Sequence, residues 1–244
     1  MKLQYCTKCP RWAGKELTCS KCEQATDQKQ LPNRRGGIYY IDSVDRQLPS
    51  VTSILQKVIS KPALTYWISQ KVAEYAFAHP DGSMEDAINA PNRVRDTAGR
   101  KGQDIHSIIE QHAKGLPINV ADHNEPWKAH VEAYVKFMDQ IPHQVLETEK
   151  MCWSLEYEYA GRLDAIIELG EKIYLVDYKT SKQIYRETTL QLSAYKLALE
   201  EQGTKIDALA VVHLKNDGAY AFHEVQPEPK AWLATLQLHN FLYS

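Results

Sequence analysis

Acidic side chains and a lysine occur in this chain where strands are expected to end. They are Glu149, Asp164, and the pair Asp177 and Lys179. Residues two apart on a strand point to the same face, so Asp177 and Lys179 should lie together, while Tyr178 points away and offers its backbone carbonyl. Carboxylates gathered from neighbouring strands repel each other unless a cation neutralises them, and such oxygen ligands suit Mg²⁺ or Mn²⁺. A lysine beside that cation can orient and help deprotonate an attacking water, which is the chemistry of phosphodiester hydrolysis.

The same residues have a simpler interpretation, in which Asp177 and Lys179 form a surface ion pair and Asp164 is an ordinary polar residue of a strand. The apolar run 173–176, directly before Asp177, argues against it. A strand this apolar should be buried, and a charge at the end of a buried strand usually serves a purpose. We therefore expect a functional site at this strand end.

Four short motifs occur in order along the chain. They are GxxxH at Gly102–His106, GxxD at Gly161–Asp164, DxK at Asp177–Lys179 and QxxxY at Gln191–Tyr195. Each is weak alone, but together, in this order and on these elements, they are a strong signal. With the segment LPSVTSIL at 48–55, they resemble the RecB-type branch of the PD-(D/E)XK nuclease superfamily, including phage and mitochondrial genome maintenance exonucleases. The resemblance covers about residues 39–225.

The resemblance implies an α/β domain with the restriction-endonuclease-like core of that superfamily, which is a mixed central sheet flanked by helices. It further implies a Mg²⁺- or Mn²⁺-dependent deoxyribonuclease, specifically an exonuclease on single-stranded DNA or DNA ends, with a place in DNA repair or recombination. Two other functions stay open: a catalytically weak module that binds nucleic acid or protein, and a PD-(D/E)XK endonuclease or RNase, because the motifs describe hydrolysis and not substrate choice.

The resemblance also implies a role for each motif residue. The metal ligands would be His106, Asp164, Asp177 and the backbone carbonyl of Tyr178, with Lys179 as the catalytic lysine. Glu149 is a further candidate ligand or supporting carboxylate, and Gln191 and Tyr195, one helical turn apart, would orient the lysine or a phosphate. Taken singly, His106 or the Gln191 and Tyr195 pair would more often be packing residues, so these roles depend on the motifs occurring together.

Cysteines are concentrated near the start of the chain. Four of the five form two CxxC pairs separated by nine residues: Cys6, Cys9, Cys19 and Cys22. Two such pairs can reach one tetrahedral Zn²⁺ at about 2.3 Å per Zn–S bond. Some RecB-type relatives hold an iron-sulfur cluster with cysteines that bracket the core, but all four here precede it, which favours zinc. We expect residues 1–30 to form a zinc module that contacts nucleic acid or a protein partner, or only clips the chain, and Cys152 to be a buried strand residue.

Residues 31–244 are expected to form the nuclease domain, with elements assigned from periodicity and turn signals. Helices are expected at 52–59, 62–77, 95–114, 127–138, 188–202 and 230–243. Strands are expected at 38–42, 144–153, 157–169, 172–178, 208–214 and 219–225, with the second to fourth of these forming a meander.

The composition is that of a soluble globular protein, with 25% charged residues and a net charge of -2. Positive charge gathers locally at residues 1–35 and 93–102, and both segments are candidates to face phosphates. No stretch approaches the roughly 20 apolar residues of a membrane helix, and residues 1–9 lack the apolar core of a signal peptide. We expect a cytoplasmic protein with no membrane contact.

Overall fold

The computed structural model describes residues 4–5, 12–14, 32–33, 37–123 and 127–243. The helices are α1 (Val51–Val58), α2 (Pro62–Ala78), α3 (Met84–Ala113), α4 (Lys128–Gln140), α5 (Glu187–Glu201) and α6 (Pro229–Tyr243), with 3-10 helices η1 (Asp42–Val44) and η2 (Val120–Asp122). The strands are β1 (Gln4–Tyr5), β2 (Trp12–Gly14), β3 (Pro32–Asn33), β4 (Ile38–Ile41), β5 (Arg46–Pro49), β6 (Gln144–Thr148), β7 (Met151–Ser154), β8 (Tyr159–Arg162), β9 (Ala165–Leu169), β10 (Lys172–Lys179), β11 (Ala208–Leu214) and β12 (Tyr220–Val225).

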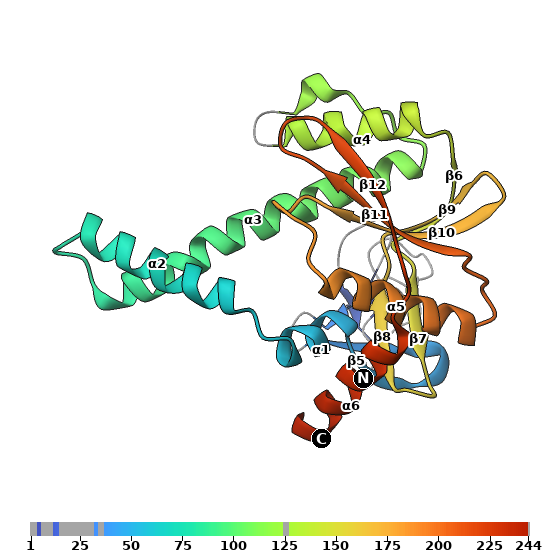
Figure 1. Cartoon of the computed structure of the whole chain (residues 1–244), viewed down its shortest axis with the longest axis horizontal. Coiled ribbons are helices and arrows are strands. Elements are labelled where there is room, and N and C mark those ends of the chain that lie inside the picture. The colour runs from blue at the N-terminus through green and yellow to red at the C-terminus, as the bar shows by residue number, and fades with distance from the viewer. Residues whose placement is uncertain (1–3, 6–11, 15–31, 34–36, 124–126, 244) are drawn as a thin grey trace.

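A five-stranded mixed sheet forms the centre of the molecule, in the order β12-β11-β10-β9-β6. Strands β10 and β11 are parallel and are joined through α5, whereas the other neighbouring strands are antiparallel. Helices α5, α1 and α6 lie on one side of the sheet, and α4 with the C-terminal half of α3 lies on the other (Figure 1). This arrangement confirms the expected mixed central sheet flanked by helices.

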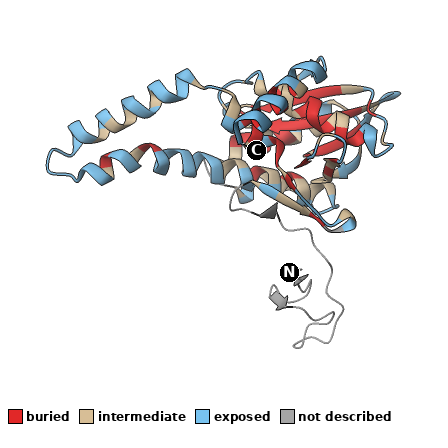
Figure 2. Cartoon of the chain, turned by 90° about the horizontal axis from the view of Figure 1, so that it is seen from below, coloured by how far each residue is buried: buried red, intermediate tan, exposed pale blue. Residues whose placement is uncertain are grey.

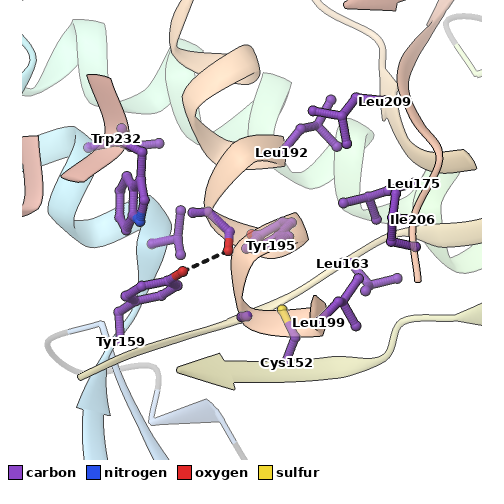
Figure 3. Close-up of a cluster of buried hydrophobic side chains, with 14 of the residues drawn as sticks. Cys152, Tyr159, Leu163, Leu175, Leu192, Tyr195, Leu199, Ile206, Leu209 and Trp232 are labelled. Atoms are coloured by element: carbon purple, nitrogen blue, oxygen red, sulfur yellow. Dashed lines mark hydrogen bonds between the residues drawn. The ribbon is translucent and has the colours of Figure 1, made fainter. Parts of the chain in front are cut away.

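Strand β10 alternates between the two apolar cores. Tyr174, Val176 and Tyr178 pack with α3 and α4, whereas Leu175 packs with α5 and α6. Side chains of a strand alternate in this way with a period of two, so Asp177 is directed to the α5 side. Figure 3 shows that core, in which the Tyr159 hydroxyl donates to the carbonyl oxygen of Ala194 at 2.8 Å. Cys152 is fully buried there, as its apolar strand predicted.

The expected meander of three long strands is wrong, because two of the strands are broken. The segment 144–153 divides into β6 and β7, and the segment 157–169 divides into β8 and β9. Strands β6 and β9 pair within the main sheet, while β7 and β8 pair in a separate two-stranded ribbon. The breaks lie opposite each other: Glu149 N donates to Asp164 O and Leu163 N to Lys150 O, both at 2.9 Å. The hairpin therefore stays paired across its bend.

Helix α3 begins eleven residues before the expected start at Arg95. Ser83 caps it by accepting a hydrogen bond from Asp86 N at 3.0 Å, and the helix continues through the buried Pro91. The expected start rested on helical spacing from Arg95 onward, and that spacing does not predict a helix that continues through a proline, which removes one backbone hydrogen bond. Together α2 and the first half of α3 form a largely exposed hairpin that projects from the sheet body (Figure 2).

The zinc module falls outside these residues: Cys6, Cys9, Cys19 and Cys22, like the domain boundary at residue 30, are not described. In the part of the chain that is described, none of the helices combines the length and apolar character needed to cross a membrane.

Candidate metal site

His106, Glu149 and Asp164 converge from α3 and from the two breaks of the bent hairpin. His106 Nδ1 lies 3.3 Å from Asp164 Oδ1 and 4.0 Å from Glu149 Oε1. One ligand atom from each residue lies within 4.8 Å of the others. An imidazole and two carboxylates at this separation can hold a divalent cation.

The bend of the hairpin positions the two carboxylates. Glu149 has a positive φ of 49°, a conformation uncommon for residues other than glycine. Asp164 directly precedes β9, and its Oδ2 accepts a hydrogen bond from Tyr178 N on β10 at 2.8 Å. Unusual backbone conformations persist where the surrounding structure enforces them, and they cluster at functional sites. The hydrogen bonds across the break provide that enforcement here.

Arg162 belongs to this cluster, although the sequence interpretation did not include it. Its Nε lies 2.7 Å from Glu149 Oε2, and its side chain is 48% exposed. A signal was available, because Arg162 stands two residues before Asp164 and residues at that spacing on a strand share a face. The guanidinium offsets part of the negative charge of the two carboxylates.

Asp177, Lys179, Gln191 and Tyr195 form a second network next to the first. Lys179 Nζ donates to Asp177 Oδ1 at 2.9 Å, which confirms that the two side chains share a face of β10. Gln191 Nε2 lies 3.2 Å from both Asp177 Oδ1 and the Tyr195 hydroxyl oxygen. Gln191, the first residue of the QxxxY motif on α5, therefore holds the Asp177 carboxylate of β10 in place.

Gly161 explains how Tyr195 fits into this network. A Cβ atom at position 161 would lie only 2.2 Å from Tyr195 Cε1, and the Tyr195 ring is itself buried. Because Gly161 has no side chain, the Tyr195 ring on α5 can lie directly against strand β8. Gly161 of the GxxD motif and Tyr195 of the QxxxY motif are direct packing partners.

The electrostatics of the first group favour a protonated His106 in the metal-free protein. Burial alone would lower the pKa of His106, but the charge and hydrogen bond of Asp164 outweigh it and raise the pKa to about 9. Burial likewise opposes ionisation of Asp164, yet His106 and Lys179 keep the pKa of Asp164 below its usual value. Opposite charges at this range favour the charged form of each partner.

The cost of burying the Asp177 carboxylate as an anion is offset less completely than for Asp164. Burial, opposed by Lys179 and reinforced by the charge of Asp164, raises the pKa of Asp177 to about 6. Its Oδ2 lies 2.8 Å from Lys179 Nζ, so the ammonium compensates only part of the effect of burial. Burial also raises the pKa of Glu149, which Arg162 opposes. For Lys179, burial would lower the pKa, but Asp177 and Asp164 raise it, so the ammonium form dominates.

These residues fit a divalent cation. Their donor set is oxygen-rich with one imidazole, and three buried or partly buried carboxylates crowd together. A cation would neutralise the repulsion that otherwise raises carboxylate pKa values. The cluster whose ligand atoms lie within 4.8 Å contains Glu149 where the resemblance implied Asp177. The ligand role of the Tyr178 carbonyl remains a prediction.

Solved structures with some similarity include SSO0001, with 17% identity, a TM-score of 0.33, and coverage of 47% of this chain and 57% of that one. The alkaline exonuclease LHK-Exo from Laribacter hongkongensis, in complex with dAMP, has 14% identity, a TM-score of 0.33 and coverage of 58% and 77%. A second structure of that exonuclease has 12% identity, a TM-score of 0.30 and coverage of 58% and 82%.

The search of curated proteins returned no match. A family model does match, and its description is "PD-(D/E)XK nuclease superfamily". The match spans residues 75–239, about two thirds of the chain. It includes α3 with His106, the bent hairpin, β10 and α5. The elements that gather the carboxylates are thus the elements of the matched family, and the chain belongs to the PD-(D/E)XK nuclease superfamily.

Proposed function

We propose that this protein is a Mg²⁺- or Mn²⁺-dependent DNA exonuclease of the RecB type, acting on single-stranded DNA or DNA ends. The observation that carries the proposal is the convergence of His106, Glu149 and Asp164 beside the Asp177 and Lys179 pair, in a chain of the nuclease superfamily. The order of the four motifs supports the RecB type and the exonuclease activity.

His106, Asp164, Glu149 and Asp177 would hold the cation. When bound, it supplies Lewis-acid stabilisation of the charge that develops on the scissile phosphate. In the reaction a water oxygen attacks phosphorus, the bond from phosphorus to the leaving oxygen breaks, the water loses a proton to solvent and the leaving oxygen takes one up. The protein's own contribution is to fix the positions and charges around that phosphate.

Lys179 acts as a charged hydrogen-bond donor in this scheme. Its ammonium lies 2.8 Å and 2.9 Å from the two Asp177 oxygens, so its position is fixed before substrate binds. A preorganised cation next to the reacting phosphate stabilises developing negative charge. Gln191 also donates to Asp177 Oδ1 and is itself in contact with the Tyr195 hydroxyl, so Gln191 and Tyr195 are both positioning residues.

The test compares wild type, Lys179→Ala and Lys205→Ala on end-labelled linear and on circular single-stranded DNA, with Mg²⁺, Mn²⁺ or EDTA. Lys205 is 83% exposed in its side chain and precedes β11, so it controls for the loss of one positive charge. We expect metal-dependent loss of linear DNA with circles spared, a decrease of about 100-fold or more in Lys179→Ala, and wild-type activity in Lys205→Ala.

Thermal melts establish that the Lys179→Ala protein is folded. Cleavage of circles would replace the exonuclease with an endonuclease, and cleavage of RNA alone would replace it with an RNase. Wild-type protein that binds DNA but is inert with every metal would refute the nuclease proposal and support the binding-module alternative.

A further inference from the structure

A shallow hollow of about 480 Å³ lies on α3, N-terminal to His106. The described residues that line it are Arg95, Asp96, Gly99, Arg100 and Gln103. All belong to the part of α3 that leads from the projecting hairpin towards the metal site (Figures 1 and 2). The hollow therefore lies on the same helix as His106.

Arg95, Gly99, Gly102 and His106 share one face of α3. Their spacing of four, three and four residues follows the helical repeat of 3.6. At 1.5 Å per residue, the stretch from Arg95 to His106 is about 16 Å long. That length corresponds to about five stacked nucleotides at about 3.4 Å per phosphate of a strand.

Gly99 leaves this face bare without a packing reason. A Cβ atom at position 99 would meet nothing within 4 Å in the described structure. A glycine within a helix costs roughly 1 kcal/mol relative to alanine, so the position carries a cost that the packing of the described residues does not explain. Glycine is favoured where a ligand must approach the backbone closely.

The charge of the hollow suits a polyanion. Within the described ranges, Arg95 and Arg100 have no carboxylate within ion-pair distance, unlike Arg93, whose guanidinium lies 2.7 Å from Asp86 Oδ1. Gln103 adds a neutral donor. Asp96 is the one acid among the described lining residues, which leaves a net charge of +1. Unpaired guanidinium groups bind phosphate oxygens with two parallel hydrogen bonds.

We propose that this face of α3, together with Arg100 and Gln103 beside it in the hollow, is a track for the backbone of a DNA single strand, which continues from the scissile phosphate at the metal site. Arg95 and Arg100 bind phosphates, Gln103 donates to the backbone, and Gly99 lets the strand lie against the helix. The proposal rests on the nuclease function proposed above, since the strand bound along α3 would be cleaved at the metal site.

Binding of fluorescein-labelled oligothymidylate by the full chain, measured by anisotropy in EDTA, tests the track without cleavage. Arg95→Ala and Arg100→Ala should each weaken binding about three- to fivefold and each reduce the slope of log K against log salt by about 0.7. Asp96→Asn should tighten binding. Lys114→Ala, which removes one charge at the far end of α3, is the matched control and should change binding by less than twofold.

A substitution at Gly99 separates a track from a structural role. Gly99→Leu adds a good helix former in open space, so the melting temperature should stay equal or rise while the affinity for the oligonucleotide falls about tenfold. Thr97→Leu introduces the same side chain at an exposed position half a helical turn away and should leave binding unchanged. Normal binding by Gly99→Leu would overturn the track.

The two proposals fail in distinguishable ways. If wild type cleaves DNA but the Arg95→Ala/Arg100→Ala double variant binds like wild type, the track is wrong and the nuclease stands. Equal weakening by Lys114→Ala would also overturn the track, because the effect would then follow net charge. If the arginine and Gly99 variants lose binding while wild type cleaves nothing with any metal, the track stands as a DNA site and the nuclease proposal fails.

Discussion

Gly161→Ala should destabilise the protein and disturb the site at the same time. The added Cβ would start 2.2 Å from Tyr195 Cε1 and 3.0 Å from Cδ1, so the buried ring or strand β8 must move by about 1 Å to reach an ordinary contact distance. Overpacking of this kind costs about 1–3 kcal/mol. For a chain of this size that corresponds to a melting temperature lower by about 2–12 °C. The rate of DNA cleavage should fall by more than the loss of folded protein would cause, because the Tyr195 hydroxyl supports Gln191 and Gln191 holds Asp177.

A double-mutant cycle tests the cause. Tyr195→Leu removes the ring. In that background Gly161→Ala should lower the free energy of unfolding by at least about 1 kcal/mol less than it does in wild type. Gly99→Ala is the matched glycine substitution, in open space within a helix, and should raise the melting temperature instead. Unfolding is followed by circular dichroism and activity on linear DNA. Additive effects in the cycle, or equal responses of the two glycines, would refute the packing argument.

Two further predictions concern bound metals. Because only a neutral imidazole binds a metal and the pKa of His106 is raised to about 9, Mn²⁺ affinity should rise about tenfold per pH unit between pH 7 and 8.5 and level off above 9. Isothermal titration should show this slope flattened in His106→Gln, and equal slopes in the two proteins would contradict the ligand assignment. The CxxC pairs still predict one zinc per chain, lost in Cys6→Ser/Cys9→Ser, and elemental analysis that finds iron, or no metal, would contradict zinc.

Much of the site could be predicted from the sequence because it depends on local spacing. The period of two on β10 places Asp177 and Lys179 on one face, and the structure confirms their contact. The spacing of four on α5 places Gln191 and Tyr195 side by side, and the 3.2 Å distance from Gln191 Nε2 to the Tyr195 hydroxyl oxygen confirms it. Apolar periodicity likewise predicted α5, β11 and α6 to within a few residues. Such relations are set within one element, where the backbone repeat alone decides which side chains meet.

The tertiary structure decided what depends on contacts between elements. The opposed breaks in the hairpin, which bring Glu149 to Asp164 and move β7 and β8 out of the main sheet, follow from cross-strand hydrogen bonds and packing on α5 that strand periodicity does not contain. The fit of Tyr195 against Gly161 joins residues of two motifs from separate elements, and the early start of α3 depends on a cap and a tolerated Pro91. Sequence spacing determined which residues face a site, while long-range packing determined which of them are close enough to hold a metal together.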